Sequence, residues 1–394
     1  MLRIAYFVSH PIQYQAPLLR LIAADPEIEL KVFFYNDFSL KPYQDLGFGR
    51  VIEWDVPLIE GYDYCFLNCW GSKQQEMSQQ SLAKDISKQL KQKQFDAVWV
   101  HGWSWLCSIQ VVLAANRLGI PVLLRGETSG LGEPTHPLKK RAKRAFLNWL
   151  FPKIAAFLYI GTLNRQFYKN YGVEDDRLFC VPYAVDNDYF QQRVMLARAN
   201  REELRRSLNL DFGRPIILYA AKLIEVKRPQ DLLAAYRLLS SDGIEPKPYL
   251  LFVGDGILRL TLEAEAKKTN WQSIRFLGFR NQSEMPAIYD LCDVFVLPSN
   301  FEPWGLAINE VMNAGKAVVV SDRVGCAPDL VREGQNGRIF TVGEITDLAE
   351  AIRFCIDHQT AGDISLKQIQ KWSYQEDIQG LKQALNYLKH KVAE

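Results

Sequence analysis

Residues 294–320 read VFVLPSNFEPWGLAINEVMNAGKAVVV. The apolar run 294–297 is typical of a strand that is buried on both faces. A polar loop follows, and residues 305–315 then carry apolar side chains at roughly helical spacing. Residues 317–320 form a second run of the buried-strand type. The order strand, loop, helix, strand predicts a βαβ unit of a parallel sheet.

The polar loop of this unit carries residues that suggest a binding site. Glu302 is expected just beyond the carboxyl end of its strand, where ligands of open α/β sheets bind. The backbone amides of Trp304, Gly305 and Leu306 would form a helix N-terminus, which suits hydroxyls and anions. Glu310 follows Glu302 by eight residues, about two helical turns into the helix. Two carboxylates at this spacing can contact two ends of one ligand. The more common explanation for an isolated pair is structural: Glu302 would stabilise the helix start, and Glu310 would simply face solvent.

This stretch resembles the Glu-x7-Glu signature of the retaining glycosyltransferases called family 4, or group 1. The likeness runs from LPSNFEPWG through AGKAVVVSDRVG to NGRIF, and weaker likeness covers nearly the whole chain. The resemblance implies an α/β GT-B fold, in which two Rossmann-like domains with parallel sheets face an interdomain cleft. The expected domains are residues 1–185 on the acceptor side and 190–374 on the nucleotide-sugar side. A C-terminal helix from about residue 375 is expected to cross back to the first domain.

The resemblance also implies roles for single residues. Glu310 is expected to hold the ribose hydroxyls of the donor, while Glu302 and the amides near Gly305 orient its sugar. Lys222 and Lys227 match the Arg and Lys positions that grip the donor diphosphate, so neither a metal nor another cofactor is expected. A lysine binds phosphate as a point charge, without the bidentate geometry of arginine. Further donor-binding residues are expected at Trp304, Leu306, Phe279, Arg280, Gly254 and Arg228.

Candidates for the acceptor side follow two predicted strands of the first domain. His101 emerges from the predicted strand 95–100, where the family often has a histidine facing the cleft. Glu127, in the loop RGETSG, is a second candidate for the base that activates the acceptor. Trp103 and Trp105 could stack on a sugar or belong to the core, because tryptophan is highly buried on average. His10, at the end of the first strand, is equally compatible with acceptor contact and with packing.

Two other segments allow more than one interpretation. Residues 36–80 are irregular, and long loops inside a compact domain are usually functional, so we interpret this one as an acceptor-side insertion, with an extra hairpin as the alternative. Residues 181–190, VPYAVDNDYF, resemble the family's interdomain linker. Their D-N-D at 186–188 also matches the DxD metal motif of the other glycosyltransferase fold, but its place after a complete α/β domain favours the linker. The lone G-D-G at 254–256 is weak evidence for a dinucleotide site.

Residues 138–151 combine a cluster of basic residues with apolar and aromatic ones. Lys139, Lys140, Arg141, Lys143 and Arg144 precede Phe146, Leu147, Trp149, Leu150 and Phe151. A basic amphipathic helix of this kind is typical of a segment that lies on an anionic membrane surface. A solvated charged face is the alternative, so peripheral membrane contact through 138–151 is a hypothesis.

Composition and charge exclude several classes of protein. Forty-seven basic and 45 acidic residues leave a formal net charge of +2, which argues against a nucleic-acid binder. The seven cysteines are scattered, without a CxxC pair, as expected for reduced cysteines of a cytosolic protein. The N-terminal apolar run is too short for a membrane span and lacks a small-residue cleavage site. We therefore expect a cytoplasmic protein, peripheral at the inner face of the membrane if the basic helix docks there.

The function expected from the sequence is a retaining hexosyl transfer. The donor would be a nucleoside diphosphate sugar, most commonly a UDP-hexose such as UDP-glucose, and the acceptor a glycan or a lipid-linked sugar in polysaccharide biosynthesis. Two alternatives use the same fold. One is a sugar-nucleotide epimerase. The other is a non-catalytic sugar-nucleotide-binding protein, suggested by Arg125 and Glu127, which occupy a loop where relatives commonly carry a histidine, and by Lys222 in the usual Arg position.

Overall fold

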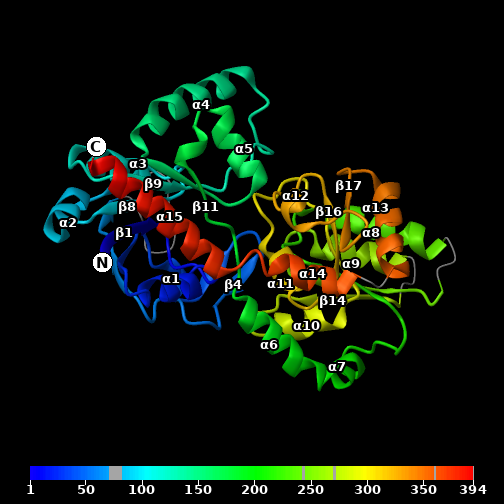
Figure 1. Ribbon diagram of the computed structural model, residues 1–394. Coiled ribbons are helices and arrows are strands. Elements are labelled where there is room, and N and C mark those ends of the chain that lie inside the picture. The colour runs from blue at the N-terminus through cyan, green and yellow to red at the C-terminus, as the bar shows by residue number, and fades with distance from the viewer. Residues whose placement is uncertain (71–81, 242–244, 269–271, 359–360, 394) are drawn as a thin grey trace. The chain divides into compact units, whose positions relative to one another are not determined.

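The computed structural model describes the chain except for residues 71–81, 242–244, 269–271, 359–360 and 394 (Figure 1). It divides into two compact units, each with its own parallel sheet. Unit 1 comprises residues 1–43, 56–183 and 374–394, and unit 2 comprises residues 44–55 and 184–373. Residues 44–55 therefore group with unit 2, whereas the sequence analysis assigned them to the first domain.

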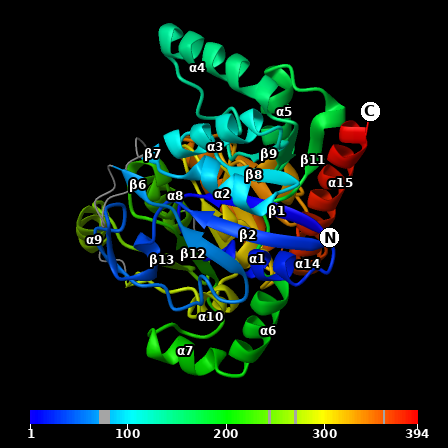
Figure 2. The same cartoon turned by 90° about the vertical axis from the view of Figure 1, so that its left-hand side faces the viewer.

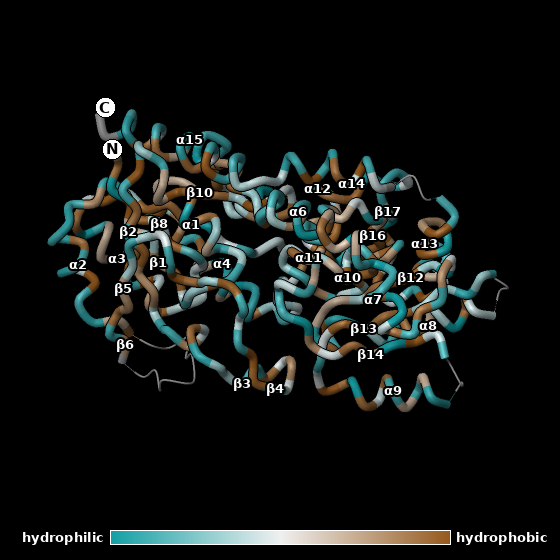
Figure 3. The backbone as a smooth tube through the Cα atoms, turned by 90° about the horizontal axis from the view of Figure 1, so that it is seen from below, coloured by the Kyte–Doolittle hydropathy of each residue, from teal (hydrophilic) through white to brown (hydrophobic). Residues whose placement is uncertain are grey.

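Unit 1 is built on a seven-stranded sheet of order β11-β10-β9-β8-β1-β2-β5, in which every adjacent pair is parallel. Its central strands are continuous apolar runs because helices cover both faces, so side chains of either register are buried. Brown, hydrophobic segments of the backbone tube mark these strands in Figure 3. The strands are β1 (Leu2–Val8), β2 (Ile28–Phe34), β5 (Asp63–Phe66), β8 (Ala97–His101), β9 (Val122–Arg125), β10 (Ala156–Tyr159) and β11 (Leu178–Cys180).

The helices of unit 1 include one from the far end of the chain. Helix α15 (Tyr374–Ala393), red in Figure 1, packs on β10 and β11 and so completes unit 1. Figures 1 and 2 both show α4 on the outside of this unit, next to α5. The other helical segments are α1 (Ala16–Ala23), η1 (Phe38–Leu40), α2 (Ile86–Lys93), α3 (Leu106–Arg117), α4 (Pro137–Leu150), η2 (Phe151–Lys153), α5 (Thr162–Asn170) and η3 (Asp175–Arg177).

Unit 2 contains a six-stranded sheet of order β14-β13-β12-β15-β16-β17, again with only parallel pairs. The predicted run 294–297 is β15, and its four side chains are at most 2% exposed. The βαβ unit predicted from 294–320 is confirmed as β15, α11 and β16. The strands are β12 (Ile216–Ala220), β13 (Tyr249–Val253), β14 (Ile274–Gly278), β15 (Val294–Leu297), β16 (Ala317–Ser321) and β17 (Gly337–Phe340).

The helices of unit 2 alternate with its strands, which satisfies the need of a parallel sheet for crossover connections. They are α6 (Asn187–Arg198), α7 (Arg201–Ser207), η4 (Glu225–Lys227), α8 (Pro229–Ser241), α9 (Arg259–Lys268), α10 (Met285–Leu291), α11 (Leu306–Met312), α12 (Ala327–Leu330), α13 (Ile345–Asp357) and α14 (Ala361–Ile369). Within the described part of the chain, no helix is both long and apolar enough to span a membrane.

Two short sheets involve the stretch 36–80, which the sequence analysis interpreted as an acceptor-side insertion, although β7 of the second sheet lies just beyond it. Strand β3 (Tyr43–Asp45) pairs with β4 (Arg50–Ile52), and β6 (Cys69–Trp70) pairs antiparallel with β7 (Leu82–Ala83). Apart from Tyr43, the first of these pairs lies in the segment that groups with unit 2 rather than with the first domain. The prediction for residues 71–80 lies outside the described residues.

Candidate functional site

The loop between β15 and α11 holds Glu302 in a fixed place at the carboxyl edge of the unit 2 sheet. The Glu302 amide donates to the Arg323 carbonyl at 3.1 Å, and the Gly325 amide donates to the Glu302 carbonyl at 3.0 Å. A Cβ at Gly325 would lie 1.9 Å from the Pro303 carbonyl oxygen, so only glycine permits this approach. Two loops from adjacent parallel strands are thereby joined directly beneath the Glu302 side chain.

Gly305 and Trp304 shape the start of α11. Gly305 has a φ of +104°, a conformation that glycine adopts without strain. The Trp304 side chain is buried, and its indole Nε1 donates to Asn309 Oδ1 at 2.8 Å. Any donor contact of Trp304 would therefore come from its backbone, as the sequence analysis proposed. Leu306, the first residue of α11, is partly exposed.

The two predicted diphosphate lysines follow β12, and each is paired with a carboxylate. Lys227 forms an ion pair with Glu302, and both side chains are less than 20% exposed. Lys222 Nζ lies 2.9 Å from both carboxylate oxygens of Asp45. Arg228, the residue just before α8, instead donates to Asp231 in the first turn of that helix at 2.5 Å. Each of the two predicted diphosphate lysines therefore already has a counter-ion in place.

Glu310 lies on α11 and faces α10. Its Oε2 accepts a hydrogen bond from the Tyr289 hydroxyl at 2.6 Å. Burial raises the pKa of Glu310 to about 7, although the Tyr289 hydrogen bond opposes that shift. Burial and the nearby Glu310 charge also raise the pKa of Tyr289, so its hydroxyl stays protonated and donates. The carboxylate keeps one oxygen for a further donor, such as a sugar hydroxyl.

The remaining predicted donor residues lie at the same edge of the sheet. Gly254 follows β13, and a Cβ there would lie 2.1 Å from the Ala221 carbonyl oxygen. Phe279 and Arg280 follow β14, where Arg280 Nη1 donates to Glu284 at 2.9 Å. Since β12 to β15 are parallel neighbours, their carboxyl ends bring residues far apart in the chain together. The structure thus gathers the predicted donor residues along one edge of unit 2.

Asp45 is a residue at this edge that the sequence analysis missed. It belongs to the β3–β4 hairpin, whose Phe48 ring lies 5.1 Å from that of Phe279. The only signal in the sequence was the pair Gly47 and Gly49 around Phe48, which is typical of a tight turn but says nothing of its partner. The contacts of this hairpin exist only through tertiary structure, so no local pattern predicts them.

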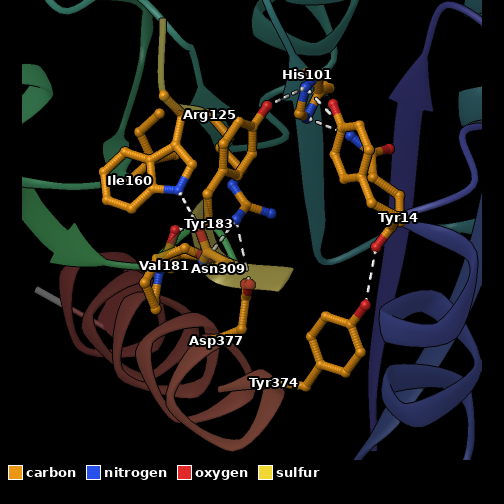
Figure 4. Close-up of polar contacts among 12 residues, drawn as sticks. Tyr14, His101, Arg125, Ile160, Val181, Tyr183, Asn309, Tyr374 and Asp377 are labelled. Atoms are coloured by element: carbon orange, nitrogen blue, oxygen red, sulfur yellow. Dashed lines mark hydrogen bonds and ion pairs between the residues drawn. The ribbon is translucent and has the colours of Figure 1, made fainter. Parts of the chain in front are cut away.

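In unit 1, His101 lies beside Tyr183 (Figure 4), and it also contacts Glu127. His101, 8% exposed, has its Nε2 3.4 Å from Glu127 Oε1 and 3.3 Å from both the Tyr183 hydroxyl and Gln15 Nε2. Tyr183 also donates to Glu127. Burial raises the pKa of Glu127, but its hydrogen bonds and the charges of His101 and Arg125 outweigh this and hold the pKa below its ordinary value. An ionised carboxylate beside an imidazole is the arrangement of a general base.

Arg125, two residues before Glu127, makes contacts that connect separate segments of unit 1. It is 2% exposed and donates to the carbonyls of Val181 and Pro182 at 3.1 and 2.7 Å (Figure 4). It also lies 3.2 Å from Asp377 of α15. Burial raises the pKa of Asp377 to about 6 despite the lowering effect of Arg125. Arg125 therefore ties two distant segments to unit 1.

Of the other residues singled out in the first domain, some pack against neighbouring side chains and others are exposed to solvent. Trp103 and Trp105 are partly buried and pack against the unit 1 core, as their core interpretation predicts. The His10 ring lies 4.4 Å from that of Phe38, and burial, with a smaller effect of His101, lowers its pKa to about 4. On α4, Lys143 pairs with Glu133 at 2.7 Å, whereas the other four basic residues are exposed.

The D-N-D sequence at 186–188 has a structural explanation. The Asp186 carboxylate caps α6 by accepting from the Tyr189 amide at 2.9 Å. Asn187 donates to the carbonyls of Ile369 and Trp372. Over the described ranges, no group of three or more His, Cys, Asp and Glu side chains could hold a metal ion.

Residues 200–375 match the family described as glycosyl transferases group 1. Among curated proteins, an N-acetylgalactosaminyltransferase that acts on a diphospho-undecaprenol sugar in Campylobacter jejuni is 26% identical over 204 residues, 52% of this chain and 51% of that protein. Glycogen synthase of Mycobacterium tuberculosis is 31% identical over 38% of this chain and 36% of its own length. The matches thus span about half or less of these relatives.

Solved structures match along nearly the entire chain. The Anabaena protein Alr3699/HepE, solved with UDP and glucose, has a TM-score of 0.68 at 19% identity, covering 96% of this chain and 98% of its own. Sucrose-phosphate synthase from Thermosynechococcus elongatus has a TM-score of 0.71 at 17% identity and full coverage of both chains. At these identities the likeness concerns the fold, and it confirms the predicted α/β class with two parallel-sheet units of the GT-B type.

Proposed function

We propose that this chain, whose residues 200–375 match the family described as glycosyl transferases group 1, is an enzyme that transfers a sugar from a nucleoside diphosphate sugar to an acceptor hydroxyl. One observation carries the proposal. The carboxyl edge of the unit 2 sheet gathers Lys222, Lys227, Glu302, Glu310 and Phe279, from three chain segments, at the place where open α/β sheets bind their ligands. Two lysines suit a diphosphate, and two carboxylates suit hydroxyls.

Each of these residues has a proposed role in donor binding. Glu310 accepts hydrogen bonds from the ribose hydroxyls, because one of its oxygens is already fixed by Tyr289. Glu302 and the amides near Gly305 orient the sugar. Lys222 and Lys227 neutralise the charge that develops on the leaving diphosphate, a form of electrostatic stabilisation that needs no metal ion.

The proposed chemistry retains the configuration at the anomeric carbon. The acceptor hydroxyl attacks from the face that the diphosphate leaves, with the departing phosphate assisting removal of the proton, so no covalent nucleophile is assigned. His101 and Glu127 of unit 1 are the proposed acceptor-side residues, because their contact with each other and with Tyr183 suits proton transfer.

The proposed donor is a UDP-hexose, with glucose as the sugar. The structure of Alr3699/HepE with UDP and glucose supports this choice. The proposed acceptor is a glycan or a lipid-linked sugar in polysaccharide biosynthesis, and the name of the Campylobacter relative, which includes diphospho-undecaprenol, supports it.

Peripheral membrane contact through α4 is a further part of the proposal. Leu138 and Trp149 on this helix are 66% and 44% exposed. They lie 11 residues apart, which is about three helical turns, so both point to the same side of α4. Lys139, Lys140, Arg141 and Arg144 are exposed on the same helix. Exposed apolar groups flanked by basic ones suit a surface of anionic lipids, where the protein would meet a lipid-linked acceptor.

Nucleotide binding tests the proposed function directly. We expect one of UDP, GDP, ADP and dTDP, alone or as its glucose or mannose conjugate, to raise the melting temperature, since ligand at 100 times its Kd adds about 2.7 kcal/mol to the free energy of unfolding. Slow release of the sugar from that conjugate would identify the donor. Glu310→Ala should abolish most of the shift, whereas Glu350→Ala, an exposed carboxylate on α13, should preserve it.

The alternatives predict other outcomes in the same assay. A non-catalytic binding protein would show the shift without release or transfer of sugar. An epimerase would release free sugar and nucleotide at the full rate when no acceptor is present. Unchanged nucleotide affinity in Glu310→Ala would contradict the role assigned to that residue.

A further inference from the structure

The hairpin formed by β3 and β4 covers part of the candidate donor site. Residues 44–55 group with unit 2, although the chain before residue 44 and the segment from residue 56 group with unit 1. Four of its residues contact side chains that the proposed function assigns to the donor. The hairpin is therefore placed to affect donor binding.

The tip of the hairpin holds the Asp45 carboxylate against Lys222. Asp45 Oδ1 accepts from the amides of Gly47 and Phe48 at 2.8 and 2.9 Å, which fixes its orientation. Both carboxylate oxygens then lie 2.9 Å from Lys222 Nζ. A Cβ at Gly47 would lie 2.8 Å from the same Nζ, so glycine permits this close approach. Asp45 presents to Lys222 two oxygens of one negative group, as a phosphate would.

Phe48 extends this contact to the predicted nucleobase region. Lys222 Nζ lies 4.8 Å from the centre of the Phe48 ring, and Phe48 meets Phe279 edge to face at 5.1 Å. Trp54 and Arg50 also contact Phe279, at 6.5 and 5.4 Å. The hairpin thus contacts both the cation at Lys222 and the aromatic ring of Phe279.

Two polar contacts hold the returning end of the hairpin to unit 2. Asn281 Nδ2 donates to the Glu53 carbonyl at 2.7 Å. Ser283 donates to the Asp55 carboxylate through its hydroxyl and, at 3.3 Å, through its amide. Because these anchors do not involve Lys222, the hairpin can remain attached to unit 2 when the contact at its tip is broken.

We infer that the hairpin 44–55 is a wall of the donor site and that Asp45 is the counter-ion a donor diphosphate displaces from Lys222. This inference rests on the proposed function, which assigns Lys222 to the diphosphate. A diphosphate carries more negative charge than one carboxylate, and like charges on the same cation repel each other. Binding of the donor therefore breaks the Asp45 contact. The apparent affinity for the donor is lowered because only molecules in which Lys222 is not paired with Asp45 are ready to bind.

Asp45→Asn tests the inference because asparagine keeps the oxygen that accepts from the two turn amides but removes the charge. We expect the variant to bind the nucleoside diphosphate about two- to fivefold more tightly, the range expected for a partly exposed ion pair. Affinity for the matching nucleoside, which has no phosphate, should stay unchanged. The measurement is calorimetric titration with UDP, GDP and ADP and with uridine, guanosine and adenosine.

Two controls keep the result interpretable. Asp357→Asn makes the same change of charge at an exposed position on α13 and should leave all affinities unchanged. Asp45→Ser is a second uncharged variant that retains an oxygen for the turn, so a fold defect peculiar to asparagine would be recognised.

The outcomes separate this inference from the proposed function. If both Asp45 variants bind the diphosphate with affinity equal to or weaker than that of the wild type, the inference is overturned, because Asp45 would then position Lys222 rather than compete for it. Binding by the wild type would still support the proposed function. Binding by the variants alone would support both, with Asp45 masking the wild-type site. Binding by neither wild type nor variants would overturn both.

Discussion

Glu310 combines a buried environment with a proposed role that needs its charge. Burial raises its pKa from the ordinary 4.5 to about 7, so near neutral pH only part of the protein carries the carboxylate that accepts from ribose hydroxyls. If only the ionised form binds, a pKa of about 7 makes nucleotide affinity about tenfold lower at pH 6 than at pH 8. Titration calorimetry with the nucleotide identified by the thermal shift measures this dependence.

Glu310→Gln is the matched variant for this prediction. It keeps an oxygen for the Tyr289 hydroxyl but does not titrate, so its affinity should be lower at pH 8 and should lack the wild-type pH dependence. The nucleotide itself titrates identically with both proteins, and the difference between them reports residue 310. Parallel pH profiles for the two proteins would contradict the assignment.

The same residue makes an opposite prediction for stability. Because the pKa of Glu310 is raised in the folded state, its favourable contribution is complete below pH 4.5 and declines as the pH rises towards 7. Above that pH the buried carboxylate is ionised at a cost. Glu310→Gln should therefore unfold at a higher urea concentration than wild type at pH 8 while binding nucleotide less well.

At the residue scale, the sequence predicted the positions of those site residues that directly follow strands of the parallel sheet. Glu302 and Lys222 each follow a buried apolar strand, and Phe279 follows the edge strand β14. Parallel strands end at one edge of the sheet, so the proximity of these residues could be predicted. Asp45 and Tyr289 could not be, because each meets its partner only through packing between elements distant in sequence. The catalytic roles assigned to these residues remain predictions.

At the scale of elements, α15 is joined to unit 1 by unusually close backbone contact. Gly380 on this helix is buried, and a Cβ there would lie 1.7 Å from the Cys180 carbonyl oxygen of β11. Glycine within a helix is ordinarily about 1 kcal/mol less favourable than alanine. Here we expect the reverse: Gly380→Ala should lower the free energy of unfolding by about 1–3 kcal/mol, the range for overpacking.

Urea unfolding of Gly380→Ala measures that change, and Gln379→Ala is its control. Gln379 is the neighbouring residue of α15 and is exposed, so its replacement should be nearly neutral. Nucleotide affinity should be unchanged in both variants, because α15 groups with unit 1. A stabilised Gly380→Ala protein would mean that α15 does not approach β11 this closely.

Long apolar strands and amphipathic helices could be predicted, whereas the β3–β4 hairpin could not. The predicted run 294–297 coincides with β15 because a strand buried on both faces has a continuous apolar signature. The hairpin has three-residue strands and an exposed Leu46 at its tip. Its stability comes from Lys222, Phe279, Asn281 and Ser283, none of which is near it in sequence.

At the scale of the whole molecule, charge is nearly balanced but locally concentrated. The formal net charge is only +2, yet four exposed basic residues lie on α4. Each basic residue near an anionic bilayer contributes about 1 kcal/mol. Replacing Lys139, Lys140 and Arg141 by Glu should therefore reduce cosedimentation with phosphatidylserine vesicles more than about tenfold, and added salt should weaken wild-type binding.

The control for this experiment reverses three exposed lysines of α2, namely Lys88, Lys91 and Lys93. The change in net charge is the same, so a similar loss of vesicle binding would show that overall charge, rather than α4, governs it. Equal pelleting of the α4 variant and wild type would count against membrane docking. Trp149→Ala should lower binding to neutral vesicles as well, because its contribution is apolar.

The division of the chain between the two units has a consequence for the order of folding during synthesis. Unit 2 needs residues 44–55 and 184–373, and all of these have been translated before α15 exists. Unit 1 contributes most of the first half of the chain but is incomplete until residues 374–394 emerge, because Arg125 has no Asp377 and β11 has no helix over it. Unit 1, most of which is translated first, can therefore complete its fold only after unit 2 has been translated. Until α15 has been synthesised, unit 1 exposes the apolar surface that this helix later covers.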